Sequence, residues 1–243
     1  MIVRPEGATL VLIAQPEHAR LAADIMARVN TEPRLLGPQR GTLLLATGEH
    51  DNGWAVVDAA PTVEPGTGWP APFTSGTPAV KVEIWERGVT AAAKLDPRAG
   101  ALVAQHALAV HDYRRRDPAW RAFFNTLTAL RDGLLHRLGA ADGPAREAFD
   151  EDYRVIRLGD AFSLHFCNGW TERQRTLGYA TSLSGLLLRI TPDPFGGARI
   201  PLRVLGHRIP ARRYVDDADL RRTMASVTAE VIEGEAAGEQ AVT

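Results

Sequence analysis

Two consecutive stretches in the middle of the chain open with the same helix-start signal, an Asp-Pro pair. They are "LDPRAGALVAQHALAVHDYRR" and "RDPAWRAFFNTLTALRDGLLHRLG". The carboxylates of Asp96 and Asp117 can accept hydrogen bonds from the first helical N–H groups, and proline fits a first turn that needs no helical N–H donor. The second stretch ends at Gly139 and carries an apolar stripe at helical spacing. The stripe consists of Trp120, Phe123, Phe124, Leu127, Leu134 and Leu138. We therefore expect two adjacent amphipathic helices, over residues 96–115 and 117–139, that each bury one face.

Further helical patterns flank this pair. Pro16 suits a first helical position, and apolar residues recur at helical spacing from there to about residue 29. The stretch "RGTLLLATGEH", residues 40–50, predicts a buried helix, with a strand as the alternative. Another helix is expected over residues 144–167. Residues 52–78 are rich in Pro, Gly and Thr and predict a long irregular segment, a kind that is usually functional or covers something.

Short strands are expected at both ends of the chain. Residues 2–4 and 10–14 predict a hairpin with a turn at Pro5–Gly7. Beyond about residue 176, short strands are expected around the turn "PDPFGG", followed by a terminal helix over residues 216–234 and a frayed end over the last ten residues.

The expected fold is therefore mainly α. A helical domain with its short N-terminal β-hairpin would span residues 1–176. A small β appendage with a terminal helix would span residues 177–243 and pack on the same core.

Composition narrows the possible partners. The formal net charge of −1 offers no overall field that favours nucleic acid or a membrane surface, so neither is expected as a partner. The single cysteine, Cys167, excludes an internal disulfide framework and a Cys-rich metal site. No apolar run approaches the roughly 20 residues of a membrane span and no targeting segment is visible, so a cytoplasmic protein is expected.

Three polar residues fall on the apolar faces of their predicted helices. His18 lies three, four and seven residues before apolar positions. His106 has apolar residues three and four positions before it and four positions after it. Asp160 has Ile156 four positions before it and Leu164 four positions after it. A lone histidine in such a place is more often a core residue than a ligand. Asp160 could form an ion pair, because arginines lie near it in the sequence. His111 points elsewhere unless its helix bends.

The pair His50–Asp51 in "GEHDNGW" adds a fourth segment with side chains that can bind a metal ion. Four segments then each offer an inward histidine or aspartate, a combination that suits Zn, Mn, Fe or similar ions. An ion with an open coordination position makes a bound water acidic enough to act as a nucleophile at neutral pH. Asp58 and Glu49 flank the pair and are candidate general bases or orienting residues, although acids beside a turn are more often solvated.

The arginines are a second set of candidate functional residues. They occur in "YRRRD", residues 113–117, and later at Arg199, Arg203, Arg208, Arg212 and Arg213. They could bind phosphate. Alternating arginines along a strand more often form a solvated face.

The order H…HD…D in this chain resembles the HD-domain superfamily of metal-dependent phosphohydrolases. "HDNGW" is similar to the "HD-x-G" string of its signalling members, and Asp160 in "RLGDAFSL" looks like its late aspartate. The resemblance implies an HD-type helical core that holds one or two divalent ions (Mn, Fe, Zn or Mg). Its ligands would be His18, His50, Asp51 and Asp160. His106, and after it His111, would hold a second ion or bind phosphate, and we assign His106 and Asp58 as candidate catalytic residues.

Over residues 1 to about 215 the chain also resembles an uncharacterised bacterial family with the strings "MIVR", "QPEHA", "HDNGW", "GDAFSLHFC" and "PDPF". That resemblance implies no substrate. The expected function is hydrolysis of a phosphate ester of a small metabolite or nucleotide. Two alternatives stay open, a di-iron oxygenase of the HD fold and a non-catalytic binding or regulatory module. The sequence leaves the oligomeric state open.

Overall fold

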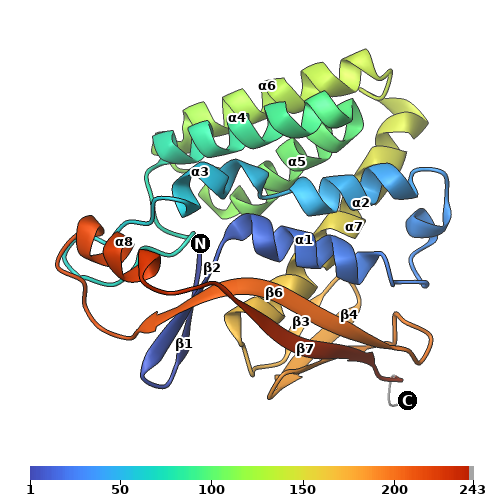
Figure 1. Ribbon diagram of the computed structural model, residues 1–243. Helices are drawn as coiled ribbons and strands as arrows, with labels where there is room; N and C mark the ends of the chain where they lie inside the picture. Colours follow the sequence, from blue (N-terminus) through green and yellow to red (C-terminus); the bar gives the residue numbers. More distant parts are fainter. Residues whose placement is uncertain (241–243) are drawn as a thin grey trace.

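The molecule is built on a seven-stranded mixed β-sheet, and the helices of the main core pack on one of its faces (Figure 1). The short helix α8 (Asp217–Ala225) packs on the other face, where Leu220 contacts a small separate core with Leu10, Leu12 and Ile209. The computed structural model describes residues 1–240. The strand order is β1-β2-β6-β7-β5-β4-β3, in which β5 and β7 are parallel and all other neighbours are antiparallel. The strands are β1 (Ile2–Glu6), β2 (Thr9–Ile13), β3 (Gln174–Thr176), β4 (Tyr179–Ser184), β5 (Leu187–Thr191), β6 (Arg199–Pro210) and β7 (Glu230–Gly238).

The helices form successive layers above the sheet. The helix α1 contacts β6, and the long helix α7 contacts β1 and β4. Helices α2 and α5 pack on α7. Helices α4 and α6 lie farthest from the sheet (Figure 1). The α-helices are α1 (Gln15–Met26), α2 (Arg40–Glu49), α3 (Ala55–Asp58), α4 (Pro78–Leu95), α5 (Pro97–Val110), α6 (Arg121–Arg137), α7 (Gly143–Asn168) and α8 (Asp217–Ala225). Short 3₁₀ helices are η1 (Pro33–Leu36), η2 (Asn52–Trp54), η3 (Asp112–Arg114) and η4 (Pro118–Trp120).

The two faces of the sheet differ sharply in polarity. Along β6 every second side chain, including Ile200, Leu202 and Val204, is buried in the main core. The intervening arginines lie on the open face, where they pair with glutamates of β7. The pairs are Arg199–Glu235 and Arg203–Glu233. The expectation of a solvated face is confirmed for Arg199 and Arg203, whereas Arg208 lies on the opposite face and pairs with Glu6 and Glu230, and Arg212 and Arg213 follow the strand.

The prediction of a mainly α fold with a small β appendage was wrong. The N-terminal hairpin does not stand apart from the C-terminal strands, because β2 pairs with β6 in the register Leu10↔Ile209. The terminal helix predicted for residues 216–234 ends at Ala225, and residues 230–238 form β7 in the middle of the sheet. The predicted fraying of the last ten residues was wrong for residues 234–238, because they belong to β7. Residues 241–243 lie outside the described part of the chain. The fold is α/β.

The helices predicted for the core are largely confirmed. The helices expected over residues 16–29, 40–50 and 144–167 are present as α1, α2 and α7, and the two Asp-Pro starts open α5 and the short helix η4 before α6. Asp96 accepts hydrogen bonds from the N–H groups of Arg98 and Ala99, as a capping residue should. No element had been predicted for residues 79–95, which belong to α4. Among residues 1–240 no helix combines the length and the apolar character needed to cross a bilayer.

Candidate metal centre

Five predicted ligand residues come together between α1, α2, α5 and α7. We call His18, His50, Asp51, His106 and Asp160 the histidine–aspartate cluster. Two overlapping groups have donor atoms within 4.8 Å of one another: the first is His18, His50 and Asp51, and the second is His50, His106 and Asp160. The three histidines and Asp51 are buried. The side chain of Asp160 keeps 16% of its surface exposed, so the cluster is reachable from outside.

His50 follows the last residue of α2 and has one nitrogen without a partner. Its Nδ1–H donates to the carbonyl of Thr47 at 2.6 Å, which fixes the remaining lone pair on Nε2 in the neutral ring. This Nε2 is fully buried and has no hydrogen bond. It lies 3.6 Å from Oδ2 of Asp51 and 3.4 Å from Oδ1 of Asp160. A buried nitrogen that faces two carboxylates and makes no hydrogen bond is the arrangement expected of a metal ligand.

His18, on α1, is held from behind by α7. The hydroxyl of Ser163 donates to the carbonyl of Asp160 at 3.1 Å, and its oxygen accepts from Nδ1 of His18 at 2.9 Å. The Nε2 atom of His18 therefore faces the cluster, 2.9 Å from Oδ2 of Asp51. Gln15, three residues earlier on α1, donates from Nε2 to the same oxygen of Asp51 at 3.2 Å. The string "QPEHA" thus supplies one cluster histidine and one residue that orients Asp51.

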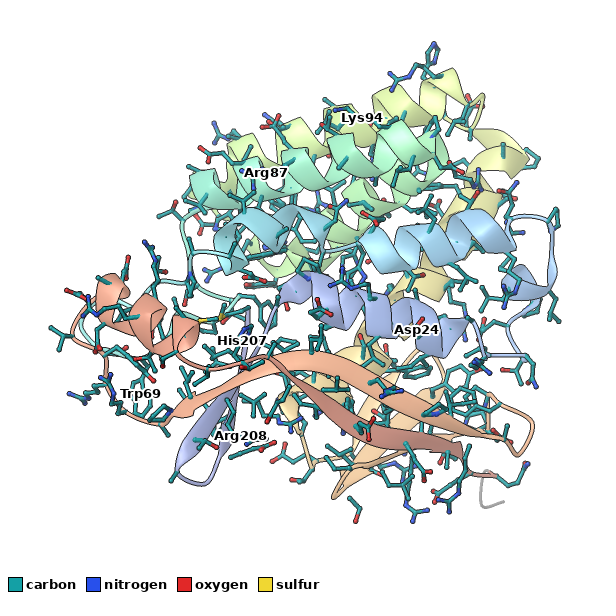
Figure 2. The ribbon with its side chains drawn as sticks, viewed as in Figure 1. Asp24, Trp69, Arg87, Lys94, His207 and Arg208 are labelled. Atoms are coloured by element: carbon teal, nitrogen blue, oxygen red, sulfur yellow. The ribbon has the colours of Figure 1, made fainter. Side chains whose placement is uncertain are left out.

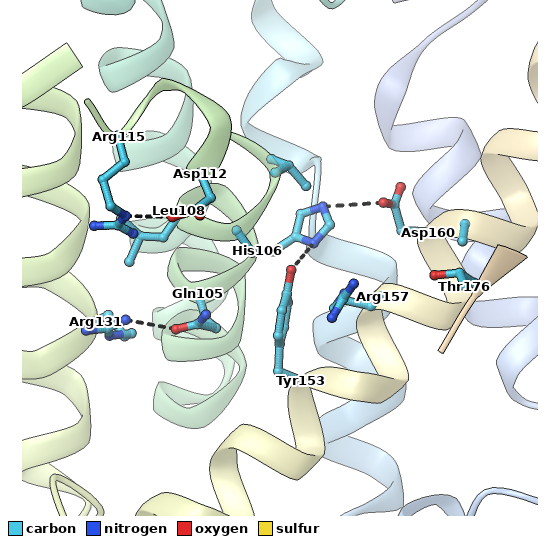
Figure 3. Close-up of a pocket in the computed structure, with 13 residues that line it drawn as sticks. Gln105, His106, Leu108, Asp112, Arg115, Arg131, Tyr153, Arg157, Asp160 and Thr176 are labelled. Carbon is cyan, nitrogen blue, oxygen red and sulfur yellow. Dashed lines mark hydrogen bonds and ion pairs between the residues drawn. The ribbon is translucent and has the colours of Figure 1, made fainter. Parts of the chain in front are cut away.

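His106, on α5, completes the set. Its Nδ1 is hydrogen-bonded to the hydroxyl of Tyr153 at 3.2 Å, and its Nε2 lies 3.9 Å from Oδ2 of Asp160 (Figure 3). The rings of His50 and His106 meet edge to face with their centres 4.8 Å apart. All three histidines are thus held through Nδ1 by groups outside the cluster and turn Nε2 inward, the support pattern of metal-ligating histidines.

Two glycines allow the segments that carry the cluster to approach this closely. Gly159 precedes Asp160 on α7, and a Cβ atom there would lie 2.7 Å from Cγ2 of Thr47 and 2.9 Å from Cγ of Met26. Gly53 of "HDNGW" lies against α4, where a Cβ atom would come within 2.0 Å of the carbonyl oxygen of Ile84. Side chains at these positions would push α7 and the His-Asp segment away from their neighbours.

The charges within the cluster shift the pKa values of its histidines and aspartates. Burial opposes a charge on His50, but Asp51 and Asp160 outweigh it and raise its pKa to about 9. Burial lowers the pKa of His106 to about 4, because its neighbouring carboxylates compensate less. Despite burial, the histidines hold the pKa of both carboxyls below the usual range, through His50 first in each case. The carboxylates therefore stay ionised at neutral pH and can take up a cation.

The alternative of an ion pair for Asp160 finds no support in residues 1–240. None of their arginines comes within ion-pair distance of its carboxylate, and Arg154 pairs with Glu32 instead. Arg157, one turn before Asp160, has no acidic partner in the described chain and lies beside the cluster (Figure 3).

The structure does not bring every candidate into the cluster. Asp58 accepts from the amino group of Met1 at 2.7 Å and from the backbone N–H of Gln15 at 2.6 Å, so both of its oxygens serve packing at the start of α1. Glu49 accepts from the side chain of Asn52. His111 donates to the carbonyl of Ala107, and burial lowers its pKa to about 4, but it belongs to neither ligand group.

Two cavities with largely different walls open onto the cluster, and both reach His106 and Asp160. The first, the arginine cleft, has a volume of about 520 Å³ (Figure 3). It is lined by Gln105, Arg115, Arg131, Tyr153, Arg157 and Thr176. The second, the aromatic cavity, has a volume of about 230 Å³ and is also lined by Asp51. Its other walls include Trp54, Phe73, Lys81, Trp85, Arg114 and Trp120.

Lys81 is the site residue that the sequence predictions missed. It lies on α4 with only 3% of its surface exposed, and its Nζ donates to the carbonyl of Phe73 and lies 4.1 Å from the centre of the Trp54 ring. A signal was available, because Lys81 precedes the apolar Ile84 and Trp85 by three and four residues, the pattern that singled out His18. It is also one of only two lysines in the chain.

Comparison with known proteins gives a family and no activity. A family described as "Protein of unknown function (DUF3891)" matches residues 1–211, which include the whole cluster and both cavities. No curated protein and no solved structure matches the chain.

Proposed function

The chain belongs to DUF3891, a family of proteins of unknown function, and from its histidine–aspartate cluster we propose that it is a metal-dependent hydrolase of phosphate esters. One observation carries the proposal. Three imidazoles, each held through Nδ1 from outside, turn Nε2 toward two ionised carboxylates in a site that two cavities reach.

The donor set fits a transition metal ion. Imidazole and carboxylate ligands suit Zn, Fe and Mn, whereas Mg prefers oxygen ligands alone. The orphaned Nε2 of His50 would gain a partner, and the two carboxylates would gain a counter-charge. The order of ligands along the chain, His18, then His50–Asp51, then Asp160, also resembles that of HD-domain phosphohydrolases.

The geometry favours a single ion at the centre. His50 belongs to both ligand groups, but its Nδ1 is engaged with Thr47, so only Nε2 can bind. One ion between Asp51 and Asp160 would use His50, and His18 and His106 would complete its coordination from either side. A divalent ion held there supplies Lewis acidity, which lowers the pKa of a water molecule and offsets charge on phosphoryl oxygens.

The arginine cleft supports a phosphate ester as substrate. Arg115 and Arg131 already pair with Asp112 and Asp132, which leaves Arg157 as the guanidinium beside Asp160 that can pair with a phosphate. In the proposed reaction, a water oxygen bonds to phosphorus and the phosphorus–oxygen bond to the leaving group breaks. The leaving oxygen takes a proton that the water has lost, so the products are phosphate and an alcohol or phenol.

A second candidate is an iron-dependent oxygenase. The second ligand group, His50, His106 and Asp160, contains two histidines and one carboxylate, which is the ligand set of many non-haem iron enzymes that activate O₂. The identity of the bound ion separates the two reactions. A third candidate, a non-catalytic module with a hydrogen-bonded polar core, requires no ion.

The first test is the metal content of the full chain, purified without an affinity metal and analysed by elemental analysis. Wild type would be compared with Asp51→Ala and Asp160→Ala, and with Asp24→Ala as the control, because Asp24 is an exposed residue of α1 (Figure 2). We expect about one ion per chain in wild type and the control, and at least tenfold less in the other two variants. Their folding would be checked by circular dichroism.

Each outcome discriminates among the candidates. Zinc or manganese together with release of phosphate from aryl phosphates would support the hydrolase. Iron with a visible spectrum and O₂ consumption would favour the oxygenase. A wild-type chain that takes up none of these ions, even when incubated with them, would rule out both enzymes and leave the cluster as a polar core.

A further inference from the structure

We propose that the aromatic cavity binds a compact ring that carries an anionic substituent, with Lys81 as the partner of that anion. In the proposed hydrolase this ring would belong to the leaving group of the phosphate ester, an assignment that rests on the proposed function.

The size and the walls of the aromatic cavity favour a compact ring as its ligand. Its volume of about 230 Å³ exceeds the ~150 Å³ of a cavity that accommodates benzene, and it falls below the ~300 Å³ at which pockets for larger ligands begin. Four of its walls are the aromatic side chains Trp54, Phe73, Trp85 and Trp120. Flat apolar walls of this kind bury a ring well.

The charge of Lys81 selects the anion. Its ammonium group is almost fully buried and has no carboxylate within ion-pair distance among residues 1–240; its contacts are the Phe73 carbonyl and the Trp54 ring. A buried charge without an opposite charge is costly. Burial lowers the pKa of Lys81 to about 8, and it outweighs the carboxylates of Asp51 and Asp58, which raise it. A divalent cation in the cluster would offset the charge of Asp51 and leave the ammonium group less compensated. An anionic ligand in the cavity would remove that cost.

The positions of the two cavities define how the substrate would lie. Both reach His106 and Asp160, but three arginines, Arg115, Arg131 and Arg157, line one cavity, whereas four aromatic rings line the other together with Lys81 and Arg114. A phosphate at the cluster, paired with Arg157, would therefore point its ester oxygen toward the aromatic cavity. The ring and its anionic substituent would then reach Lys81.

The test measures binding of phenylacetate to the full chain, with and without metal ion, through quenching of tryptophan fluorescence. The neutral isostere phenylacetamide lacks the charge, and acetate lacks the ring. We expect phenylacetate to bind at least tenfold more tightly than either. Lys81→Met should remove the preference for the acid by weakening phenylacetate binding much more than phenylacetamide binding. The matched control is Lys94→Met, because Lys94 is the other lysine of the chain and is exposed on the same helix (Figure 2).

Several results would overturn the inference. Equal affinity for phenylacetate and phenylacetamide in wild type would remove the role of the anion, and this comparison does not depend on any variant folding. Inorganic phosphate whose binding depends on Lys81, without any preference for the ring acid, would assign the lysine to the phosphate instead. A Lys81→Met variant that still prefers phenylacetate would remove Lys81 as the partner.

A second measurement separates this inference from the proposed function. In the loaded protein, kcat/KM for 4-(carboxymethyl)phenyl phosphate should exceed that for phenyl phosphate at least tenfold, and Lys81→Met should abolish the difference. A chain that takes up no ion but still prefers phenylacetate would overturn the hydrolase and retain the ring-acid site. A chain that takes up its ion and hydrolyses phenyl phosphate without any preference for the ring acid would overturn the site and retain the hydrolase.

Discussion

His50 binds its proton more tightly than an ordinary histidine, because the carboxylates of Asp51 and Asp160 outweigh the burial that opposes its charge and raise its pKa from 6.5 to about 9. The folded-state pKa lies above the unfolded one, so the protonated ring contributes stability that is fully present below about pH 6.5 and is lost as the pH rises through 9. A metal ion must displace this proton, so metal affinity should follow the opposite trend.

We therefore expect the melting temperature of the metal-free chain to fall between pH 6.5 and 9.5, while its affinity for zinc rises over the same range by up to about tenfold per pH unit. Each kcal/mol lost corresponds to about 2–4 °C in a chain of this size. Thermal scans and zinc titrations measure the two trends. His50→Gln should flatten both, and His136→Gln, at the exposed end of α6, should flatten neither. A zinc affinity that does not change with pH would contradict the assignment of His50 as a ligand.

At the scale of single residues, the sequence predicted the cluster because helical spacing identifies which polar residues face inward. His18, His106 and Asp160 were found in this way, and the structure brings them together with His50 and Asp51. The sequence could not predict the orienting partners, since Ser163 and Tyr153 are separated from their histidines by 145 and 47 positions. It also assigned Asp58 to catalysis, whereas the structure engages both of its oxygens elsewhere.

At the scale of the elements, the position of Asp160 depends on how closely α7 approaches α2. A Cβ atom on Gly159 would clash with Thr47, whose hydroxyl is itself fixed by the carbonyl of Leu43. We expect Gly159→Ala to cost about 1–3 kcal/mol and to reduce metal retention, because α7 must shift with its carboxylate. Chemical denaturation and elemental analysis measure the two effects.

The matched control for this prediction is Gly133→Ala on α6, where only the distant end of Arg137 lies near the added methyl group. Alanine is the better helix former there, so the substitution should leave stability unchanged or raise it by up to about 1 kcal/mol. Similar stabilities for the two variants would show that close approach at Gly159 is not required.

The elements that the sequence misassigned are those whose state depends on distant partners. Residues 230–238 form a strand because β6 and β5 flank them and because Gly234 lies against Phe166 of α7, where a Cβ atom would come within 2.5 Å of the ring. Local spacing does not contain that information, so the segment was extended as a helix. The Asp-Pro helix starts, in contrast, are local signals, and the structure confirms them.

At the scale of the whole molecule, one sheet joins the two ends of the chain. The first two strands lie within residues 1–13, and they enter the sheet only through the pairing of β2 with β6. The main hydrophobic core likewise contains side chains from β1 and β2, from α7, and from β5, β6 and β7. The helices that carry the histidine–aspartate cluster therefore pack on a surface to which both ends of the described chain contribute.

This arrangement predicts the behaviour of a fragment that ends at residue 176. The fragment would keep every histidine and aspartate of the cluster but would lose β4 to β7, and with them the partner edge of β2 and the cover over Phe162 and Phe166. Unpaired strand edges and exposed apolar faces favour aggregation. We expect the fragment to aggregate or to melt without a cooperative transition, and to hold no stoichiometric ion, when gel filtration and circular dichroism compare it with the full chain. A monomeric fragment that melts cooperatively and retains its ion would instead establish residues 1–176 as an independent metal-binding domain.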